Sequence, residues 1–211
     1  MKFEIWLLFI AVWSATTMPI GPNVINCVSI SSKQGFKHSL WTVPGIGLAA
    51  MLHISIGLTG LAALLVANPV LFDIIRYAGA SYMLYMAYKM WRDKGMKLEN
   101  TEIKATTALS VFRQAFLISF SNPKAILVNV AIFSQFIDTG IALLPQLFIL
   151  LPTALIIDAA IYGGYCGLGT GIGKLLGKPK QQQLFSKVIA VFYFAISIGF
   201  LTYDPASTKA K

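Results

Sequence analysis

Three side chains that can carry a charge stand inside long apolar stretches of this sequence: His53, Lys124 and Asp158. A charge in an apolar medium is costly, and proteins generally retain one there for ion pairing, substrate binding or proton transfer. We therefore predict that Asp158 and Lys124 lie close enough to pair, and that Asp158 and His53 serve ion or proton coupling, because histidine titrates near neutral pH. A structural ion pair, and a histidine that only bonds to a neighbouring helix, are the alternative interpretations.

Two proline motifs interrupt apolar stretches in the two halves of the chain: Gly21, Pro22 and Asn23 in the first, and Asn122, Pro123 and Lys124 in the second. Proline removes a backbone donor and breaks the helix before it. At membrane depth the freed backbone groups must face protein or a water-filled cavity. Amides at a helix N-terminus suit a carboxylate, and freed carbonyls suit an ammonium group. We predict that these six residues form the site for a small zwitterion; a packing kink is the alternative.

The composition indicates the medium in which these elements fold. Of the 211 residues, 56% are hydrophobic and only 12% are charged, and the mean hydropathy is +0.71. A soluble domain is about a quarter charged, so the sequence predicts an integral membrane protein of one domain spanning residues 1–211. The net charge of +9 comes from short loops, which favours contact with anionic lipid over nucleic-acid binding.

Six apolar segments are long enough to cross a bilayer, which takes roughly 20 residues. The predicted spans are 5–31, 40–66, 70–90, 108–137, 144–168 and 184–203. A charged stretch at about 92–107 is predicted to be a connecting loop. The N-terminus has features of a signal peptide, but Glu4 lies in its charged region and the first proline motif follows closely, so we expect no cleavage.

Lysine and arginine are unevenly distributed between the two ends of the predicted spans. Twelve of them follow spans one, three and five, and four lie at the opposite end. By the positive-inside rule those three loops are cytoplasmic and both termini lie outside the cytoplasm. The twelve are Lys33, Lys37, Lys89, Arg92, Lys94, Lys97, Lys104, Arg113, Lys174, Lys178, Lys180 and Lys187.

The two halves of the chain are weakly similar to each other. The proline motifs correspond, Pro44 aligns with Pro152, and that register places Ala50 over Asp158. Three helices in each half invert the second half relative to the first, as in many secondary transporters. We expect an all-α membrane protein of two inverted three-helix repeats, about 1–91 and 108–205, with broken helices 1 and 4. Prolines are frequent in membrane helices, which is the alternative explanation.

The chain resembles the LysE/RhtB family of bacterial amino-acid exporters. The resemblance rests on MPIGPN, GIGLAAMLH, YAGASYMLYMAYK and SNPKAILVNVAIFSQF, which occur in order over nearly the whole chain. It implies a permease of the bacterial inner membrane that exports amino acids or close derivatives with the proton gradient. It implies no enzyme activity and no cofactor. Its partners would be an amino-acid substrate and membrane lipids, and a homodimer is compatible with it.

The sequence departs from that family at two places. The family usually has Pro-Gly-Pro-Asn in the first span, whereas here Ile20 precedes the glycine and Pro19 is displaced by one residue. The family also usually has a Gly-Asp pair in the second span, and here those positions are Ala49 and Ala50. The missing acid bears on substrate type and coupling, because a membrane carboxylate commonly binds an ammonium group or relays a proton.

Two other functions remain as alternatives. A metal-ion exporter would need several carboxylates, cysteines or histidines inside the membrane, and few stand there. A membrane thiol–disulfide carrier would use Cys27, but the corresponding residue after the second proline motif is Val128, and Cys166 belongs to another span. The sequence contains no nucleophile–histidine–acid set, phosphate-binding glycine loop or zinc motif, so we predict no catalytic or metal site. Asn129 is a secondary candidate for substrate contact, and we interpret the tyrosines of the third span as packing and interface anchors.

Overall fold

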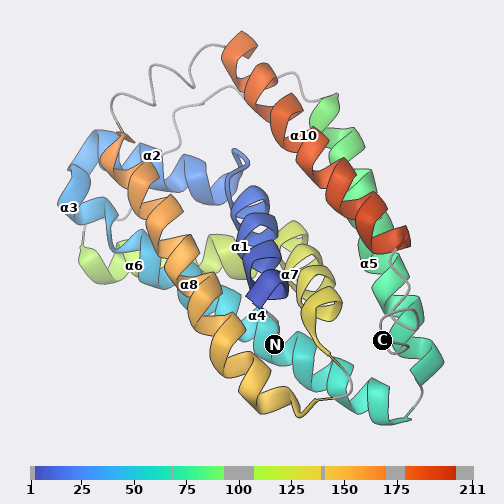
Figure 1. Ribbon diagram of the computed structural model, residues 1–211. Coiled ribbons are helices and arrows are strands. Elements are labelled where there is room, and N and C mark those ends of the chain that lie inside the picture. The colour runs from blue at the N-terminus through green and yellow to red at the C-terminus, as the bar shows by residue number, and fades with distance from the viewer. Residues whose placement is uncertain (1–2, 68, 93–106, 139–140, 170–178, 203–211) are drawn as a thin grey trace.

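The structure is a computed structural model that describes residues 3–67, 69–92, 107–138, 141–169 and 179–202. The described part is helical and contains no strand (Figure 1). The predicted connecting loop lies almost wholly outside it. The helices are α1 (Phe3–Thr17), α2 (Pro22–Gln34), α3 (Phe36–Ser39), α4 (Thr42–Ala67), α5 (Pro69–Trp91), α6 (Ala108–Phe120), α7 (Pro123–Phe136), α8 (Leu143–Gly167) and α10 (Pro179–Thr202).

Both predicted breaks are present, and a proline begins the helix after each. Pro22 is the first residue of α2 and Pro123 is the first residue of α7. This position suits proline because its missing N–H would have no partner in the first turn. The chain bends by 65° between α1 and α2 and by 68° between α6 and α7. By contrast, Pro152 lies inside α8 without ending it.

The helices follow the predicted spans closely, but fewer of them qualify as membrane spans by length and hydropathy. Within the described residues three helices qualify, or up to five if each bent pair is one span. The helix outside this count is α5, which is 23 residues long and whose sequence includes Asp73, Arg76 and Lys89. The predicted arrangement of six spans is therefore supported only in part.

Close helix packing joins the two halves of the chain. The longest interfaces are those of α4 with α6 and of α5 with α10, while α8 packs against both α1 and α2. Gly45 on α4 lies so close to α6 that a Cβ atom there would collide with the carbonyl oxygen of Phe112. Gly79 on α5 has a similar approach to Ala131 on α7. Small residues permit such backbone contact between membrane helices.

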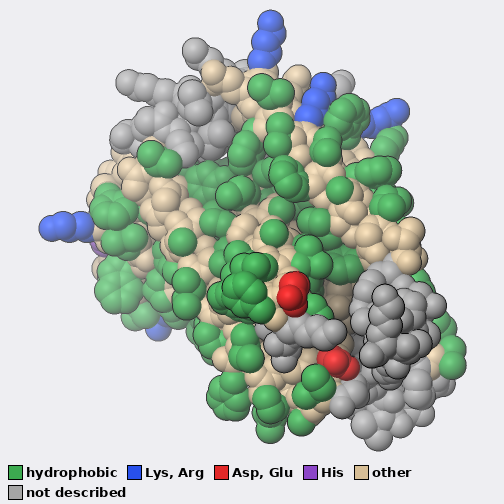
Figure 2. Space-filling view, viewed as in Figure 1, with side chains coloured by type: hydrophobic (Ala, Val, Ile, Leu, Met, Phe, Trp, Pro, Cys, Tyr) green, Lys and Arg blue, Asp and Glu red, His purple; other side chains and the backbone are tan. Residues whose placement is uncertain are grey.

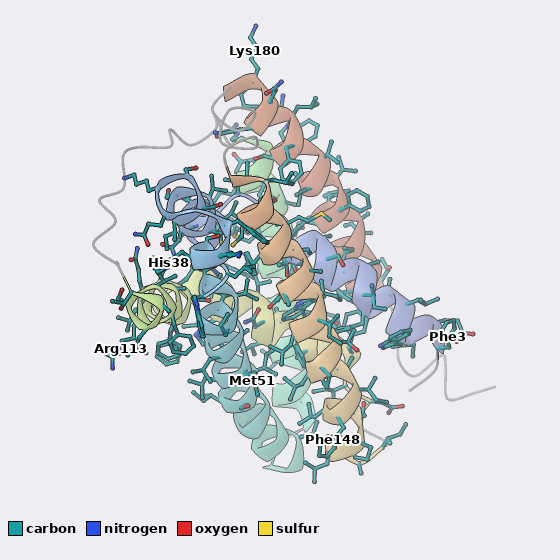
Figure 3. The ribbon with its side chains drawn as sticks, turned by 90° about the vertical axis from the view of Figure 1, so that its left-hand side faces the viewer. Phe3, His38, Met51, Arg113, Phe148 and Lys180 are labelled. Atoms are coloured by element: carbon teal, nitrogen blue, oxygen red, sulfur yellow. The ribbon has the colours of Figure 1, made fainter. Side chains whose placement is uncertain are left out.

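The core and the surface are both apolar. Phe9 and Trp13 of α1 pack against Phe133 and Phe136 of α7 in the middle of the molecule. Large apolar side chains also cover much of the outer face, while lysine and arginine project at its upper and left margins (Figure 2). An apolar exterior of this kind is what lipid contact requires. His38 and Arg113 lie on one side of the molecule and Phe3 on the other (Figure 3).

Candidate functional site

A cavity of about 80 Å³ lies where the two helix breaks meet. Its wall includes five of the predicted site residues from both halves of the chain: Gly21, Pro22, Asn23, Asn122 and Asp158. It also includes Trp13, Thr16, Thr17, Pro19, Val24, Ile46, Ala50, Ser119, Ala125, Val128, Asn129 and Tyr162. The fold thus brings residues of both proline motifs to one cavity, and their role in substrate binding stays a prediction. The wall combines one carboxylate with amides, hydroxyls and small apolar side chains.

Asp158 supplies the carboxylate of the cavity, and α1 holds it in place. Its side chain on α8 is 6% exposed. The indole Nε1 of Trp13 and the hydroxyl of Thr17 each donate a hydrogen bond of 2.9 Å to Oδ1 of Asp158. Hydrogen bonds to the charged form stabilise a buried carboxylate, and they also fix its orientation. Asp158 thus joins α8 to the end of α1 next to the first break.

Two helix N-termini border the same cavity. Gly21 is the N-cap of α2, and no side chain caps this end of the helix. The amides of Asn23 and Val24 therefore have no acceptor within the helix. Helix α7 begins at Pro123, and its neighbours Asn122 and Ala125 also line the cavity. The helix dipole makes both of these ends partly positive, so the cavity has two regions that favour an anionic group and one carboxylate that favours a cation.

Asn23 connects the two breaks. Its Nδ2 donates to the hydroxyl of Ser119 near the end of α6, at 3.2 Å. Its Oδ1 is buried and has no hydrogen-bond partner among the described residues. Tyr162, one helical turn after Asp158, lines the same cavity. An unpaired buried acceptor is costly, and a donor group on a bound ligand would satisfy this one.

Two backbone carbonyls at the first break accept hydrogen bonds from tyrosine side chains. The Tyr165 hydroxyl donates to the carbonyl oxygen of Met18 at 2.6 Å, and the Tyr193 hydroxyl donates to that of Thr16 at 3.4 Å. Each of these two carbonyls already accepts one hydrogen bond, and its binding of an ammonium group stays a prediction. The carboxylate of Asp158 is the stronger acceptor in the cavity wall, because it is ionisable.

His53 lies apart from the cavity wall. It is 4% exposed on α4, its Nε2 donates to the carbonyl oxygen of Phe120 at 3.1 Å, and its ring stacks on the Phe120 ring at 5.2 Å. Phe120 is the last residue of α6, so His53 satisfies a carbonyl that the second break frees. The structure thus shows a contact that stabilises the helix break, and the proton relay stays a prediction.

The side chains of Pro123 and Lys124 lie outside the described residues. The predicted ion pair between Lys124 and Asp158 is therefore not tested by the geometry. The hydrogen bonds that the structure describes for the Asp158 side chain come from two neutral residues, Trp13 and Thr17.

The two cysteines, which belong to different predicted spans, are brought together by the fold. The thiol of Cys27 on α2 lies 3.1 Å from the hydroxyl of Thr42, and the thiol of Cys166 on α8 lies 3.5 Å from the same hydroxyl. Both are free and buried. Neither lines the cavity, so their role in this structure is to pack α2 and α8 against the start of α4.

Sequence reasoning missed Trp13, Thr17, Ser119 and Tyr162 as parts of the site. One signal was available, because Trp13 and Thr17 are four residues apart and share a helix face, as Asp158 and Tyr162 do. Which face points inward depends on the packing of α1 against α8, and the sequence alone does not specify that packing.

Comparison with known proteins agrees with the architecture. Residues 14–204 match the description of the LysE type translocator family. An uncharacterized membrane protein of Pseudomonas aeruginosa is 34% identical over 86% of this chain and 85% of its own length. The homoserine/homoserine lactone efflux protein of Salmonella typhimurium is 26% identical over 93% of this chain and 95% of its own. An uncharacterized membrane protein of Vibrio cholerae is 28% identical over 92% and 94%. No solved structure matches significantly.

Proposed function

This chain belongs to the LysE type translocator family, and from that premise we propose that it exports a small amino acid or a close derivative across the bacterial inner membrane. The observation that carries the proposal is the cavity of about 80 Å³ between two helix N-termini and a buried carboxylate. The homoserine and homoserine lactone efflux named for the Salmonella relative favours a small substrate without a charged side chain.

The cavity is suited to a zwitterion. The substrate carboxylate binds at the start of α2, where the amides of Asn23 and Val24 have no helical acceptor, and at the facing start of α7. The substrate ammonium group binds Asp158, whose second oxygen is left for this contact when Trp13 and Thr17 hold the first. The small apolar side chains of the wall then accommodate a short side chain.

Proton coupling is part of the same proposal. Asp158 is the carboxylate of the cavity wall, so a proton and a substrate ammonium group compete for it. Protonation from the outside would release the substrate there, and loss of the proton to the cytoplasm would prepare the site for the next molecule. His53 and Lys124 are the other groups that we propose for this coupling, on the basis of the sequence.

The helix contacts support an inverted-repeat arrangement. In the repeat, α1 and α2 correspond to α6 and α7, α4 to α8, and α5 to α10. Helix α4 packs on α6 and α7. If the two halves are exchanged, this corresponds to α8 packing on α1 and α2, which is also observed. The same exchange converts the α2–α6 contact into the α7–α1 contact, and both are observed. Such repeats place the substrate at the interface of the halves.

Efflux from loaded vesicles tests this function. Purified protein in proteoliposomes is loaded with single labelled amino acids, including homoserine, and efflux is followed with and without an imposed proton gradient. We expect gradient-dependent efflux of a small neutral amino acid, and weaker efflux of lysine or glutamate. Equal efflux from protein-free vesicles for every compound would contradict the proposal.

A further inference from the structure

Two helix interfaces of opposite chemistry flank the cavity, which α1, α2, α6 and α7 all line. Towards the N-terminal side of the break, α1 packs on α7 through aromatic rings. Phe9 meets Phe133 and Phe136 at ring-centroid distances of 5.6 and 5.2 Å, and Trp13 meets Phe133 at 5.4 Å, all edge to face. This geometry is favourable for aromatic pairs, and the apolar seal needs no polar partner.

The other interface, between α2 and α6, is mainly polar. We refer to its three side-chain pairs as the α2–α6 seam. Asn23 donates to Ser119 at 3.2 Å, and Gln114 Nε2 donates to Asn26 Oδ1 at 3.0 Å. The third pair, furthest from the cavity, is Ile30 with Val111, which form an apolar cluster of their own.

The α2–α6 seam is incompletely satisfied. Oδ1 of Asn23 and Nδ2 of Asn26 have no hydrogen-bond partner among the described residues. Both atoms are buried, and the Asn26 side chain is only 4% exposed. Water would satisfy both atoms if the helices parted, whereas water gives nothing to the rings between α1 and α7. The closed seam is thus the less stable of the two seals.

Each helix of the seam is bound more firmly to another neighbour. Ser31 of α2 donates to the carbonyl oxygen of Cys166 on α8 at 2.6 Å, and Ser32 donates to that of Gly169 at 3.1 Å. Helix α6 packs on α4 at the Gly45 contact and through the bond from His53 to Phe120. If α2 moves with α8 and α6 moves with α4, these two units separate at the seam while they stay in contact where Cys27 and Cys166 meet Thr42 at the start of α4.

From this geometry we propose that the α2–α6 seam is the gate through which the cavity opens towards the side of Lys33, Lys37 and Arg113, by separation of Asn26 from Gln114. The aromatic α1–α7 interface stays closed while this gate is open. The proposal rests on the transport function above, since it assigns the path by which the substrate reaches the cavity. In the repeat, the two interfaces are equivalent, so that one opens while the other remains packed.

Thiol labelling measures the opening directly. In a Cys27→Ser, Cys166→Ser background, Asn26→Cys reports on the seam and Phe136→Cys reports on the aromatic interface. The two positions are matched, at 4% and 5% exposure, so a difference in labelling reflects opening. With a small water-soluble maleimide on purified protein in detergent, we expect Asn26→Cys to react at least about tenfold faster. Gln114→Cys reports the same opening from α6 if the Asn26 variant folds poorly.

Cross-linking then tests whether the opening is required for transport. A short bifunctional thiol reagent on Asn26→Cys with Gln114→Cys should abolish efflux, because the seam can no longer part. The control is Ser32→Cys with Leu168→Cys, which links α2 to α8 within one moving unit and should leave efflux intact.

Two results would overturn the gate, and neither depends on the identity of the substrate. One is labelling of Phe136→Cys at least as fast as that of both Asn26→Cys and Gln114→Cys. The other is undiminished efflux from protein cross-linked between positions 26 and 114. A failure of the proposed function gives a different result, because labelling needs no substrate. In that case the wild-type protein would export no amino acid, while Asn26→Cys would still be labelled faster than Phe136→Cys.

Discussion

Asp158 is the residue on which the proposed chemistry depends most. Two donors four residues apart on α1 hold one of its oxygens, at 2.9 Å each. A carboxylate with a single rotamer presents its charge to the cavity in a fixed place, which lowers the entropy that a substrate must lose on binding. The same two bonds tie α8 to the last turn of α1, next to the first break.

We expect Asp158→Asn to be inserted in the membrane and to lose export. A hydrogen bond to a charged group contributes about 1.5–3 kcal/mol, so substrate affinity should fall by roughly one to two orders of magnitude. Thr17→Val is the control, because it removes one donor and leaves the charge, and its effect should be smaller. Efflux and the amount of protein in the membrane are measured for both.

The double variant Lys124→Met, Asp158→Asn separates function from pairing. If the charges only pair with each other, removing both should restore efflux that either single change loses. We expect the double variant to remain inactive although stably inserted, and recovered efflux would contradict the role of Asp158 in transport.

Some of the site could be predicted from single residues, and some could not. Pro22 and Pro123 were reliable because proline breaks a helix through its own covalent structure. Asp158 was identifiable because its charge is costly among apolar neighbours. His53 is equally conspicuous in the sequence, but it bonds to the carbonyl oxygen of Phe120 and lies away from the cavity wall. The contact of the two cysteines with Thr42 depends on tertiary packing, which residue spacing in the sequence does not reveal.

At the scale of helices, the long elements were predictable and their detailed packing was not. The predicted apolar segments coincide with the long helices of the described part, although α5 does not qualify as a membrane span by its own hydropathy. The contact between α4 and α6 depends instead on Gly45, where the backbone of one helix touches that of the other. A glycine in an apolar segment of the sequence does not indicate which helix will pack against it.

Replacing Gly45 should therefore destabilise the protein. In Gly45→Val the new Cβ would collide with the Phe112 carbonyl oxygen, and backbone atoms cannot move aside cheaply. We expect a loss of about 1–3 kcal/mol, typical of an overpacked core, seen as a lower thermal midpoint in detergent. Gly164→Ala is the control, because no described atom outside its own stretch of helix lies within 4 Å of the added Cβ and alanine favours a helix by up to about 1 kcal/mol. Equal midpoints for both variants would contradict this close contact.

For the whole molecule, the charge distribution predicts the orientation in the membrane. The described Lys33, Lys37 and Arg113 are exposed, and the labelled His38 and Arg113 lie on the side opposite Phe3 (Figure 3). Because the positive-inside rule places the basic loops in the cytoplasm, the start of α1 and the end of α10 should face outward.

Reporter fusions test this orientation. A reporter that is active only outside the cytoplasm should be active when fused after Lys211. The same reporter inserted in the predicted loop at 92–107 should be inactive, which provides the control. Activity of a cytoplasm-only reporter at the C-terminus would contradict the predicted position of that terminus outside the cytoplasm.

The side chains that cover the carbonyls at the helix breaks have a consequence for the driving ion. Broken helices in transporters often coordinate Na⁺ through such carbonyls, but here Tyr165 covers Met18, Tyr193 covers Thr16 and His53 covers Phe120. A cation would have to displace these donors to reach the oxygens. We therefore expect the initial rate of efflux to be unchanged when choline replaces all Na⁺ at constant ionic strength and constant proton gradient. A rate that rises with Na⁺ concentration would mean that the hydroxyls and the imidazole leave these carbonyls during transport.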